Sequence, residues 1–174
     1  MLMKNMTKKT RKPVHETQPT TFRLAVQYAT VHDDLPTRPQ FRRWVKAALM
    51  QHAEIVLRLV DETEGRELNR QFRHKDYATN VLTFAYDDTT PLTGDIVLCA
   101  PVISAEAQQQ HKDLLAHYAH LTVHGILHLQ GYDHLEDTEA AAMEQLETQI
   151  LMRLGYADPY LEHDDSAAID EIRH

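Results

Sequence analysis

The stretch from residue 124 to residue 134, His-Gly-Ile-Leu-His-Leu-Gln-Gly-Tyr-Asp-His, constrains the fold of this chain most strongly. Residues four apart on a helix lie on one face, so His124 and His128 can direct two imidazoles at one metal ion. Gly131 follows three residues later, where a helix can end in the left-handed conformation that glycine adopts without steric penalty. The chain can then reverse and bring His134 to the same ion. The sequence therefore predicts a metal-binding helix and turn.

The spacing His-x-x-x-His-x-x-Gly-x-x-His is that of the metzincin signature. Three histidines leave one position of a tetrahedral zinc open, which is typical of a catalytic zinc, since a structural zinc normally has four protein ligands. In metalloproteases of this type a glutamate follows the first histidine and serves as general base, whereas this chain has Gly125 there. We therefore predict a catalytic metal and disfavour a peptidase.

The same helix carries two further histidines, His117 and His120. His120 and His124 are also four residues apart, but no glycine turn and third histidine follow that pair at the right distance. We predict that His117 and His120 are surface residues or contact the metal ligands from outside.

The length of 174 residues and an apolar content of 43% fit one domain with a hydrophobic core. We expect the domain over 22–161, after a flexible basic segment, 1–21, and before an acidic tail, 162–174. No apolar run is long enough to cross a membrane, and the N-terminal segment lacks the apolar part of a secretory signal. The single Cys99, in an apolar strand-like run, is predicted to be a small buried side chain in a reducing cytoplasm.

The net charge of −8 hides an asymmetry along the chain. Residues 1–75 contain 15 Lys and Arg against 8 Asp and Glu, whereas residues 76–174 contain 3 against 18. Such a split is consistent with a basic face directed at a polyanion. It is equally consistent with charges that pair across the fold.

Hydrophobic periodicity predicts an α+β fold, a single mixed sheet of about four strands flanked by five or six helices, one of them a zincin-like metal helix. The order of the strands does not follow from these patterns. The predicted strands are about 22–29, 55–60, 80–85 and 94–100, and the predicted helices about 37–52, 61–72, 101–111, 113–130 and 137–154.

A second informative stretch is basic and directly precedes the third predicted strand. It contains Arg70, Arg73, His74 and Lys75 beside aromatic residues. Such cations can hold a phosphate backbone or the charge that develops on a phosphoryl group, although a basic loop before a strand is usually a solvated turn. We expect a cleft between the metal helix and the segment 66–75.

With both stretches in view, the chain closely resembles the YbeY family of bacterial endoribonucleases, which act as rRNA maturation factors. The resemblance spans roughly residues 22–161, with small departures: Phe72 stands where Tyr is common, Ala78 where Pro is common and Thr83 where Ser is common. The residues that carry it are Leu68-Asn69, Phe72 to Asp76, Thr79 to Phe84, Gly94 to Val97, His124 to His134, Leu154 to Tyr156 and Asp158 to Tyr160.

The resemblance implies a metal-dependent endoribonuclease that cuts single-stranded RNA, matures the 3′ end of 16S rRNA and takes part in ribosome quality control. Its partners would be the 16S rRNA precursor, the small ribosomal subunit and assembly factors. One zinc ion per chain, or another divalent transition metal such as nickel, would be held by His124, His128 and His134. Arg73 and His124 would be the catalytic residues.

The expected chemistry is phosphodiester cleavage in which the ion activates water or polarises a phosphate oxygen while Arg73 stabilises negative charge. Either water or the RNA 2′-hydroxyl can be the nucleophile. Asp95 and Asp133 either orient a metal ligand or serve as turn and cap residues. The alternatives to a nuclease are a non-enzymatic ribosome assembly factor with a structural metal and, less favoured, a metzincin-like peptidase.

Overall fold

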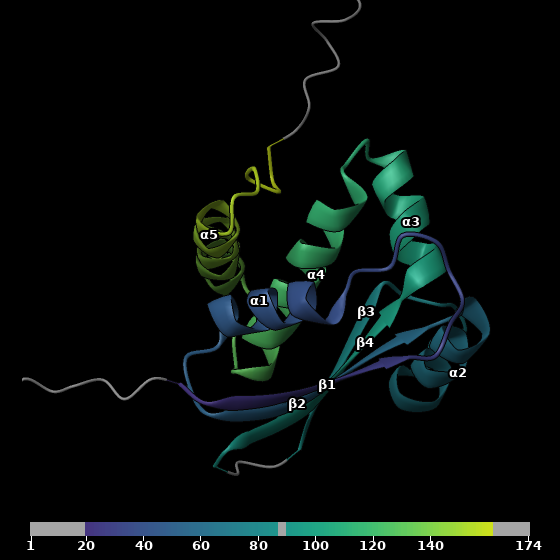
Figure 1. The fold of residues 1–174 in the computed structure, drawn as a ribbon, viewed down its shortest axis with the longest axis horizontal. Coiled ribbons are helices and arrows are strands. Elements are labelled where there is room, and N and C mark those ends of the chain that lie inside the picture. Colours follow the sequence, from purple (N-terminus) through teal and green to yellow (C-terminus); the bar gives the residue numbers. More distant parts are fainter. Residues whose placement is uncertain (1–19, 87–89, 162–174) are drawn as a thin grey trace, which may run out of the picture.

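The computed structural model describes residues 20–86 and 90–161, which form one four-stranded sheet and five helices (Figure 1). Nearly all of the predicted basic segment and the whole predicted acidic tail lie outside the described residues. The elements are β1 (Phe22–Tyr28), α1 (Arg38–Ala48), β2 (Ala53–Val60), α2 (Glu62–Arg73), β3 (Val81–Tyr86), β4 (Leu92–Cys99), α3 (Ala100–Gln109), α4 (Leu114–Leu129) and α5 (Asp137–Arg153).

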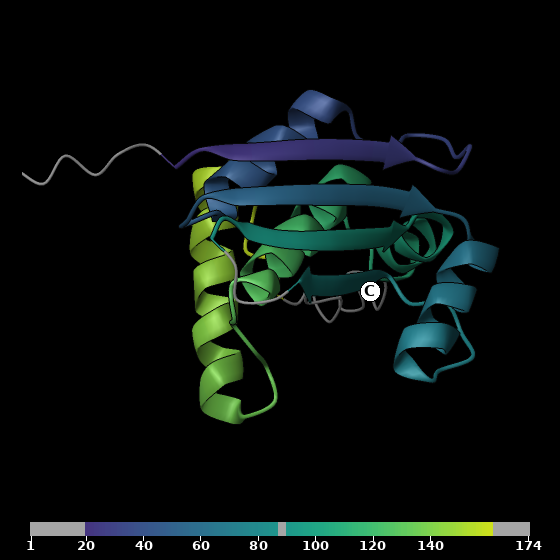
Figure 2. The ribbon, with the colours of Figure 1, turned by 90° about the horizontal axis from the view of Figure 1, so that it is seen from below.

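The sheet is mixed, with the strand order β1-β2-β4-β3. β1, β2 and β4 run parallel to one another, and β3 pairs antiparallel with β4 at the edge of the sheet. The four strands lie side by side in Figure 2. This arrangement confirms the predicted α+β class and adds the strand order that the sequence left open.

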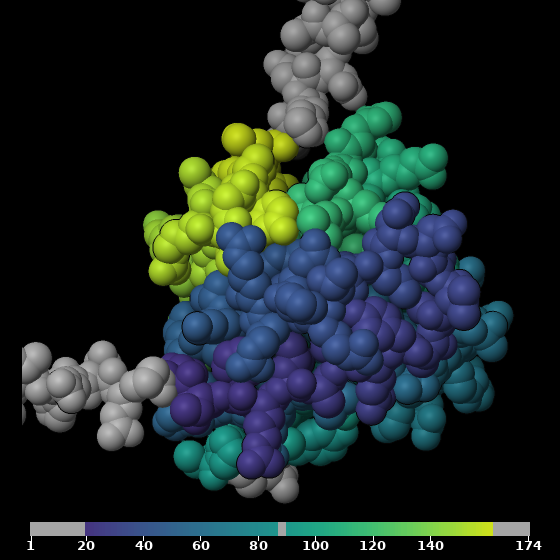
Figure 3. All heavy atoms as spheres, in the orientation of Figure 1, coloured from purple at the N-terminus to yellow at the C-terminus, as the bar shows by residue number. Residues whose placement is uncertain are grey.

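One face of the sheet packs against α4, which in turn contacts α1, α3 and α5. Trp44 of α1, Ile96 of β4 and Ile126 of α4 are fully buried between these elements. In the view of Figure 3, residues of β1 and α1 lie at the centre of the visible surface, below those of α5. Because α4 is buried along most of its length, as predicted, it is a rigid support for any side chain it presents.

The opposite face of the sheet packs against α2. Side chains alternate between the two faces along a strand, so each strand contributes to both cores. Val60, Leu82, Val97 and Cys99 form a second, smaller core there. A Cβ atom at Gly65 of α2 would lie 3.0 Å from the sulfur of Cys99, so glycine permits the close approach of helix and strand. Cys99 is buried, as predicted.

Local capping explains where several elements begin. Thr37 and Gln40 form a capping box at the start of α1. The side chains of Asp61 and Asp113 each accept one backbone hydrogen bond at the starts of α2 and α4. α1 ends at Ala48, earlier than predicted, because Leu49 is already extended and buried. No helix in the described part of the chain is long and apolar enough to cross a membrane.

Candidate metal centre

α4 presents two of the three predicted ligands on its one partly exposed stripe. The rings of His124 and His128 are nearly parallel, 7° apart, with their centroids separated by 6.4 Å. The neighbouring residues Gly125, Ile126 and Leu127 are buried. The core therefore fixes the backbone from which both imidazoles project.

The turn after α4 returns the chain toward the helix, as the glycine spacing predicts. Gly131 has a φ of 97°, in the left-handed region, and the backbone N–H of Tyr132 donates to the carbonyl of Leu127 over 3.2 Å. The ring of His134 then lies 5.6 Å from that of His124 and 6.0 Å from that of His128. The three imidazoles form a compact triangle.

This triangle fits a zinc ion. With Zn–N bonds of about 2.1 Å and tetrahedral angles, three bound imidazoles would have their centroids about 5 Å apart. The observed separations exceed that by an ångström or less in two of the three pairs. Small side-chain rotations would close the triangle around an ion.

Hydrogen bonds at Nδ1 orient the rings of His124 and His128 in a way that suits metal binding. Nδ1 of His128 lies 3.0 Å from the carbonyl oxygen of Tyr132, and Nδ1 of His124 lies 2.5 Å from a carboxylate oxygen of Glu147. Carbonyl and carboxylate oxygens only accept, so each Nδ1 carries the proton and each Nε2 keeps its lone pair. Both lone pairs are then available to a metal ion.

Asp133 offers an additional oxygen beside the triangle. Ligand atoms of His128, Asp133 and His134 lie within 4.8 Å of one another, a set that omits His124. The carboxylate of Asp133, however, also accepts a hydrogen bond of 2.7 Å from the backbone of His134 and so stabilises the turn. We favour the three-histidine set because the Nδ1 atoms of His124 and His128 are both held by acceptors.

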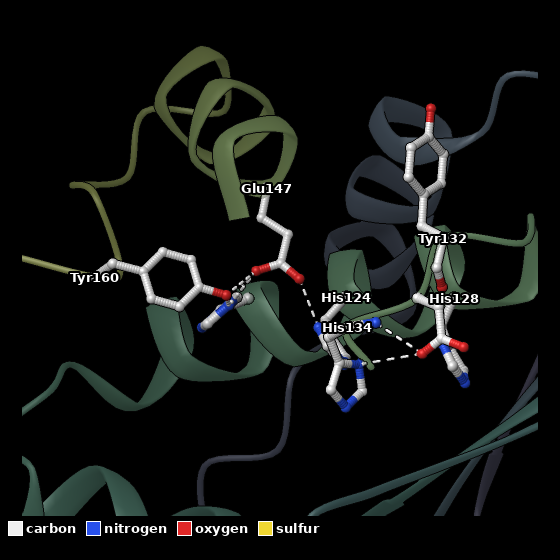
Figure 4. A network of polar contacts seen from close by, with 8 residues as sticks. His124, His128, Tyr132, His134, Glu147 and Tyr160 are labelled. Atoms are coloured by element: carbon white, nitrogen blue, oxygen red, sulfur yellow. Dashed lines mark hydrogen bonds and ion pairs between the residues drawn. The ribbon is translucent and has the colours of Figure 1, made fainter. Parts of the chain in front are cut away.

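Glu147, on α5, contacts the candidate site and was missed by sequence reasoning. It is 1% exposed and accepts hydrogen bonds from His124, from Nε2 of His120 at 2.9 Å and from the hydroxyl of Tyr160. Figure 4 shows its carboxylate between His124 and Tyr160. A signal did exist, because Glu147 occupies the same buried face of α5 as Met143, Ile150 and Leu151.

The electrostatics of Glu147 follow from these contacts. Burial raises the pKa of a carboxyl group, but the hydrogen bonds from His120, His124 and Tyr160 together outweigh it and lower the pKa of Glu147 to about 2. Burial, together with the bond to this carboxylate, raises the pKa of Tyr160. Glu147 is therefore a buried anion that faces His124.

The three histidines line a pocket of about 450 Å³ together with the end of α2 and the strand β3. Arg73, the last residue of α2, reaches it and donates from Nη2 to the carbonyl of Thr83 over 3.1 Å. The predicted cleft between the metal helix and the basic segment is thus confirmed. Its walls are Asn69, Arg73, Lys75, Tyr77, Thr79, Val81, Leu82, Thr83, His124, His128 and His134.

The arginines of α2 differ in how their charge is used. Arg66 forms an ion pair of 2.8 Å with Asp76, and Arg70 forms one of 2.7 Å with Glu67. Arg73 has no acidic partner among residues 20–86 and 90–161; its hydrogen bond goes to a neutral carbonyl. Its positive charge is therefore available to an anion in the pocket.

The other histidines of α4 are not surface residues. His117 is 5% exposed and bonded to Glu106 over 2.9 Å, so the prediction of a surface or ligand-contacting role was wrong for it. Burial lowers the pKa of His117, against the opposing effect of Glu106. His120 contacts Glu147, which is hydrogen-bonded to His124. It therefore lies next to the predicted ligands, in agreement with the second of the two predicted positions.

Neither of the two aspartates predicted as possible orienting groups has a hydrogen bond to a ring nitrogen of His124, His128 or His134. Asp95 accepts a hydrogen bond from the hydroxyl of Tyr86 and does not line the histidine pocket. Asp133 lies 3.9 Å from Nδ1 of its neighbour His134, too far for a hydrogen bond. For Asp133 the turn interpretation therefore holds, whereas Glu147 contacts Nδ1 of His124.

Comparison with known proteins agrees with this geometry. The family model described as Endoribonuclease YbeY matches residues 24–155. The chain is 67% identical to an Endoribonuclease YbeY of Nitrosomonas europaea over 79% of this chain and 84% of that protein, and 58% identical to one of Nitrosospira multiformis over 88% and 89%. A Thermotoga maritima protein with a known solution structure is 26% identical, with a TM-score of 0.55 over 81% of this chain and 99% of that one.

Proposed function

The chain belongs to the YbeY family of endoribonucleases, and from that premise we propose that it cleaves single-stranded RNA at a zinc centre held by His124, His128 and His134. The observation that carries this assignment of residues is the pocket itself. Two helices, a turn and an edge strand surround a single space with three imidazoles and the guanidinium of Arg73, whose hydrogen bond goes to a neutral carbonyl.

Each side chain has a definable task in this proposal. Glu147 and the carbonyl of Tyr132 hold the Nδ1 protons of His124 and His128, so that both Nε2 atoms face the pocket. Arg73 binds the phosphodiester and stabilises the negative charge that develops on its oxygens. A bound zinc ion, or another divalent transition metal such as nickel, supplies Lewis acidity and lowers the pKa of water.

Gly125 supports a nuclease over a peptidase. A Cβ atom at this position would lie 3.2 Å from Cδ1 of Ile96 and 3.4 Å from Cγ2 of Thr83, so the residue after the first histidine faces the sheet. A glutamate could not reach the pocket from there without displacing the core. In this chain the position at which metalloproteases carry their general base has no side chain and packs against the sheet.

The natural substrate we propose is the 16S rRNA precursor, at its 3′ end, with the small ribosomal subunit and its assembly factors as partners in the cytoplasm. Membership of the family supports this choice. The single cysteine, buried and unpaired, agrees with a reducing compartment.

The test compares four proteins: wild type, Arg73→Ala, His128→Ala and the control Arg70→Ala, whose arginine is already paired with Glu67. Each is assayed for bound metal by elemental analysis and for cleavage of a single-stranded RNA and of its duplex. We expect Arg73→Ala to keep its metal and to cleave RNA about a hundredfold or more slowly. Removing one hydrogen-bond donor to a transition-state oxyanion typically lowers an enzyme's rate by that factor.

We expect His128→Ala to lose both metal and cleavage, and Arg70→Ala to resemble the wild type. Equal cleavage by all four proteins would mean that a contaminating nuclease is responsible. A wild type that holds one metal ion and cuts no RNA would refute the proposal in favour of a structural metal.

A further inference from the structure

A second groove lies beside the histidine pocket, on the other face of the sheet. We call it the aromatic groove; its volume is about 590 Å³, and Phe72, Phe84 and Tyr86 supply its rings. A volume in this range is typical of sites that hold small molecules or parts of larger ones. Nothing in the chemistry described so far uses it.

The rings of the groove are fixed in place yet open to solvent. Phe72 packs edge-on against Phe84 with centroids 5.2 Å apart, and the hydroxyl of Tyr86 donates to Asp95. Even so, Phe72 is 53% exposed and Tyr86 is 51% exposed. Positioned aromatic rings with much of their surface uncovered are suited to stacking against a planar ligand.

The groove and the histidine pocket adjoin at the edge of the sheet. Arg73 and Thr83 line both, and they are joined by the hydrogen bond from the guanidinium to the Thr83 carbonyl. Thr83 lies on β3, the edge strand, so no further strand separates the two spaces. A polymer whose phosphate is bound at Arg73 can pass over this edge and place its next unit in the groove.

We propose that the aromatic groove is a base subsite, in which an unpaired nucleobase adjacent to the cleaved phosphodiester stacks on Phe72 and Tyr86. The inference rests on the proposed function and deepens it. Every base has a π-face, so such stacking tolerates different sequences. It also accounts for a preference for single strands, because the faces of a base within a duplex are covered by its neighbours.

The experiment measures binding separately from cleavage. A fluorescently labelled single-stranded RNA is titrated in EDTA, which keeps it uncut, against wild type, Phe72→Ala, Phe72→Trp and the control Met152→Ala. Met152 is 60% exposed on α5 and lines none of the pockets described. We expect Phe72→Ala to raise the Kd about tenfold, as for loss of one stacked base, and the other two variants to bind like the wild type.

A set of RNAs with a single abasic nucleotide moved along the chain identifies the stacked position. One position should weaken wild-type binding about tenfold and leave Phe72→Ala binding unchanged. The subsite is refuted if Phe72→Ala binds like wild type, or if the abasic cost is the same in both proteins at every position. If Phe72→Ala binds RNA with the affinity of the wild type, a protein partner becomes the better candidate for the groove.

Two further measurements keep the outcomes separate. Thermal unfolding shows whether Phe72→Ala is folded, and Tyr86→Ala, which removes a ring from an exposed edge, gives an independent test of the same groove. Zinc-loaded wild type that cuts RNA while both variants bind it normally refutes only the subsite. Wild type that binds RNA through Phe72 yet never cuts it refutes the proposed function and retains the groove as a binding site.

Discussion

Replacing Glu147 with glutamine tests how the metal centre is supported. The substitution keeps the volume of a side chain that is 1% exposed, but removes its charge and leaves one acceptor oxygen instead of two. In the wild type, one carboxylate oxygen accepts from His124 and the other from His120 and Tyr160. The single amide oxygen of glutamine can accept on only one of these two sides.

The expected magnitude follows from the hydrogen bond to His124. A hydrogen bond to a charged group contributes roughly 1.5–3 kcal/mol, against roughly 0.5–1.5 kcal/mol for a neutral one. The substitution therefore costs roughly 1–1.5 kcal/mol at His124, which is a factor of about 5 to 13 in an equilibrium constant. We predict that Glu147→Gln binds zinc about tenfold more weakly, within the range of about 10–100-fold typical of partners of metal-bound histidines.

The assay is a competition titration of zinc between the protein and a chromophoric chelator. Glu144→Gln is the matched control, since Glu144 is exposed on the same helix. At saturating zinc we expect Glu147→Gln to regain most of its RNA cleavage, because Glu147 does not line the pocket. A zinc Kd within twofold of the wild type would show that Glu147 does not support His124, and the reasoning would be wrong.

Two other predictions concern the turn and the buried histidine. Gly131→Ala should lower the free energy of unfolding by roughly 1–2 kcal/mol, because φ is 97° and an alanine is strained there even though its Cβ meets no neighbouring atom. It should also weaken zinc binding by displacing His134. Urea unfolding measures the first effect and the chelator titration the second, and unchanged values would contradict the prediction. His117 has a lowered pKa, so its contribution to stability is complete above its ordinary pKa of 6.5 and is lost as the pH falls below it. His117→Gln should flatten the dependence of unfolding free energy on pH between about 7.5 and 5, and an unchanged dependence would exclude His117 as a source.

The histidine centre was predictable from sequence because its geometry is local. The spacing of His124, His128, Gly131 and His134 within eleven residues determines a helix, a turn and a triangle of rings. The same holds for most helix starts, where a cap such as Asp61 or Asp113 acts within three residues. Local rules were sufficient for these features.

The features that were missed depend on contacts between distant segments. Glu147 meets His124 across 23 residues, and no local pattern states which helices will pack together. The strand order and the burial of His117 against Glu106 have the same origin. Which of the arginines Arg66, Arg70 and Arg73 of α2 are paired with acids also required the folded structure.

The order of the elements along the chain has a consequence for synthesis on the ribosome. The arginine at the end of α2 emerges early, whereas the histidines of α4, the turn after it and Glu147 of α5 follow 50 to 75 residues later. An incomplete chain that lacks α5 has no partner for His124. The proposed metal centre is therefore complete only when most of the chain has been translated.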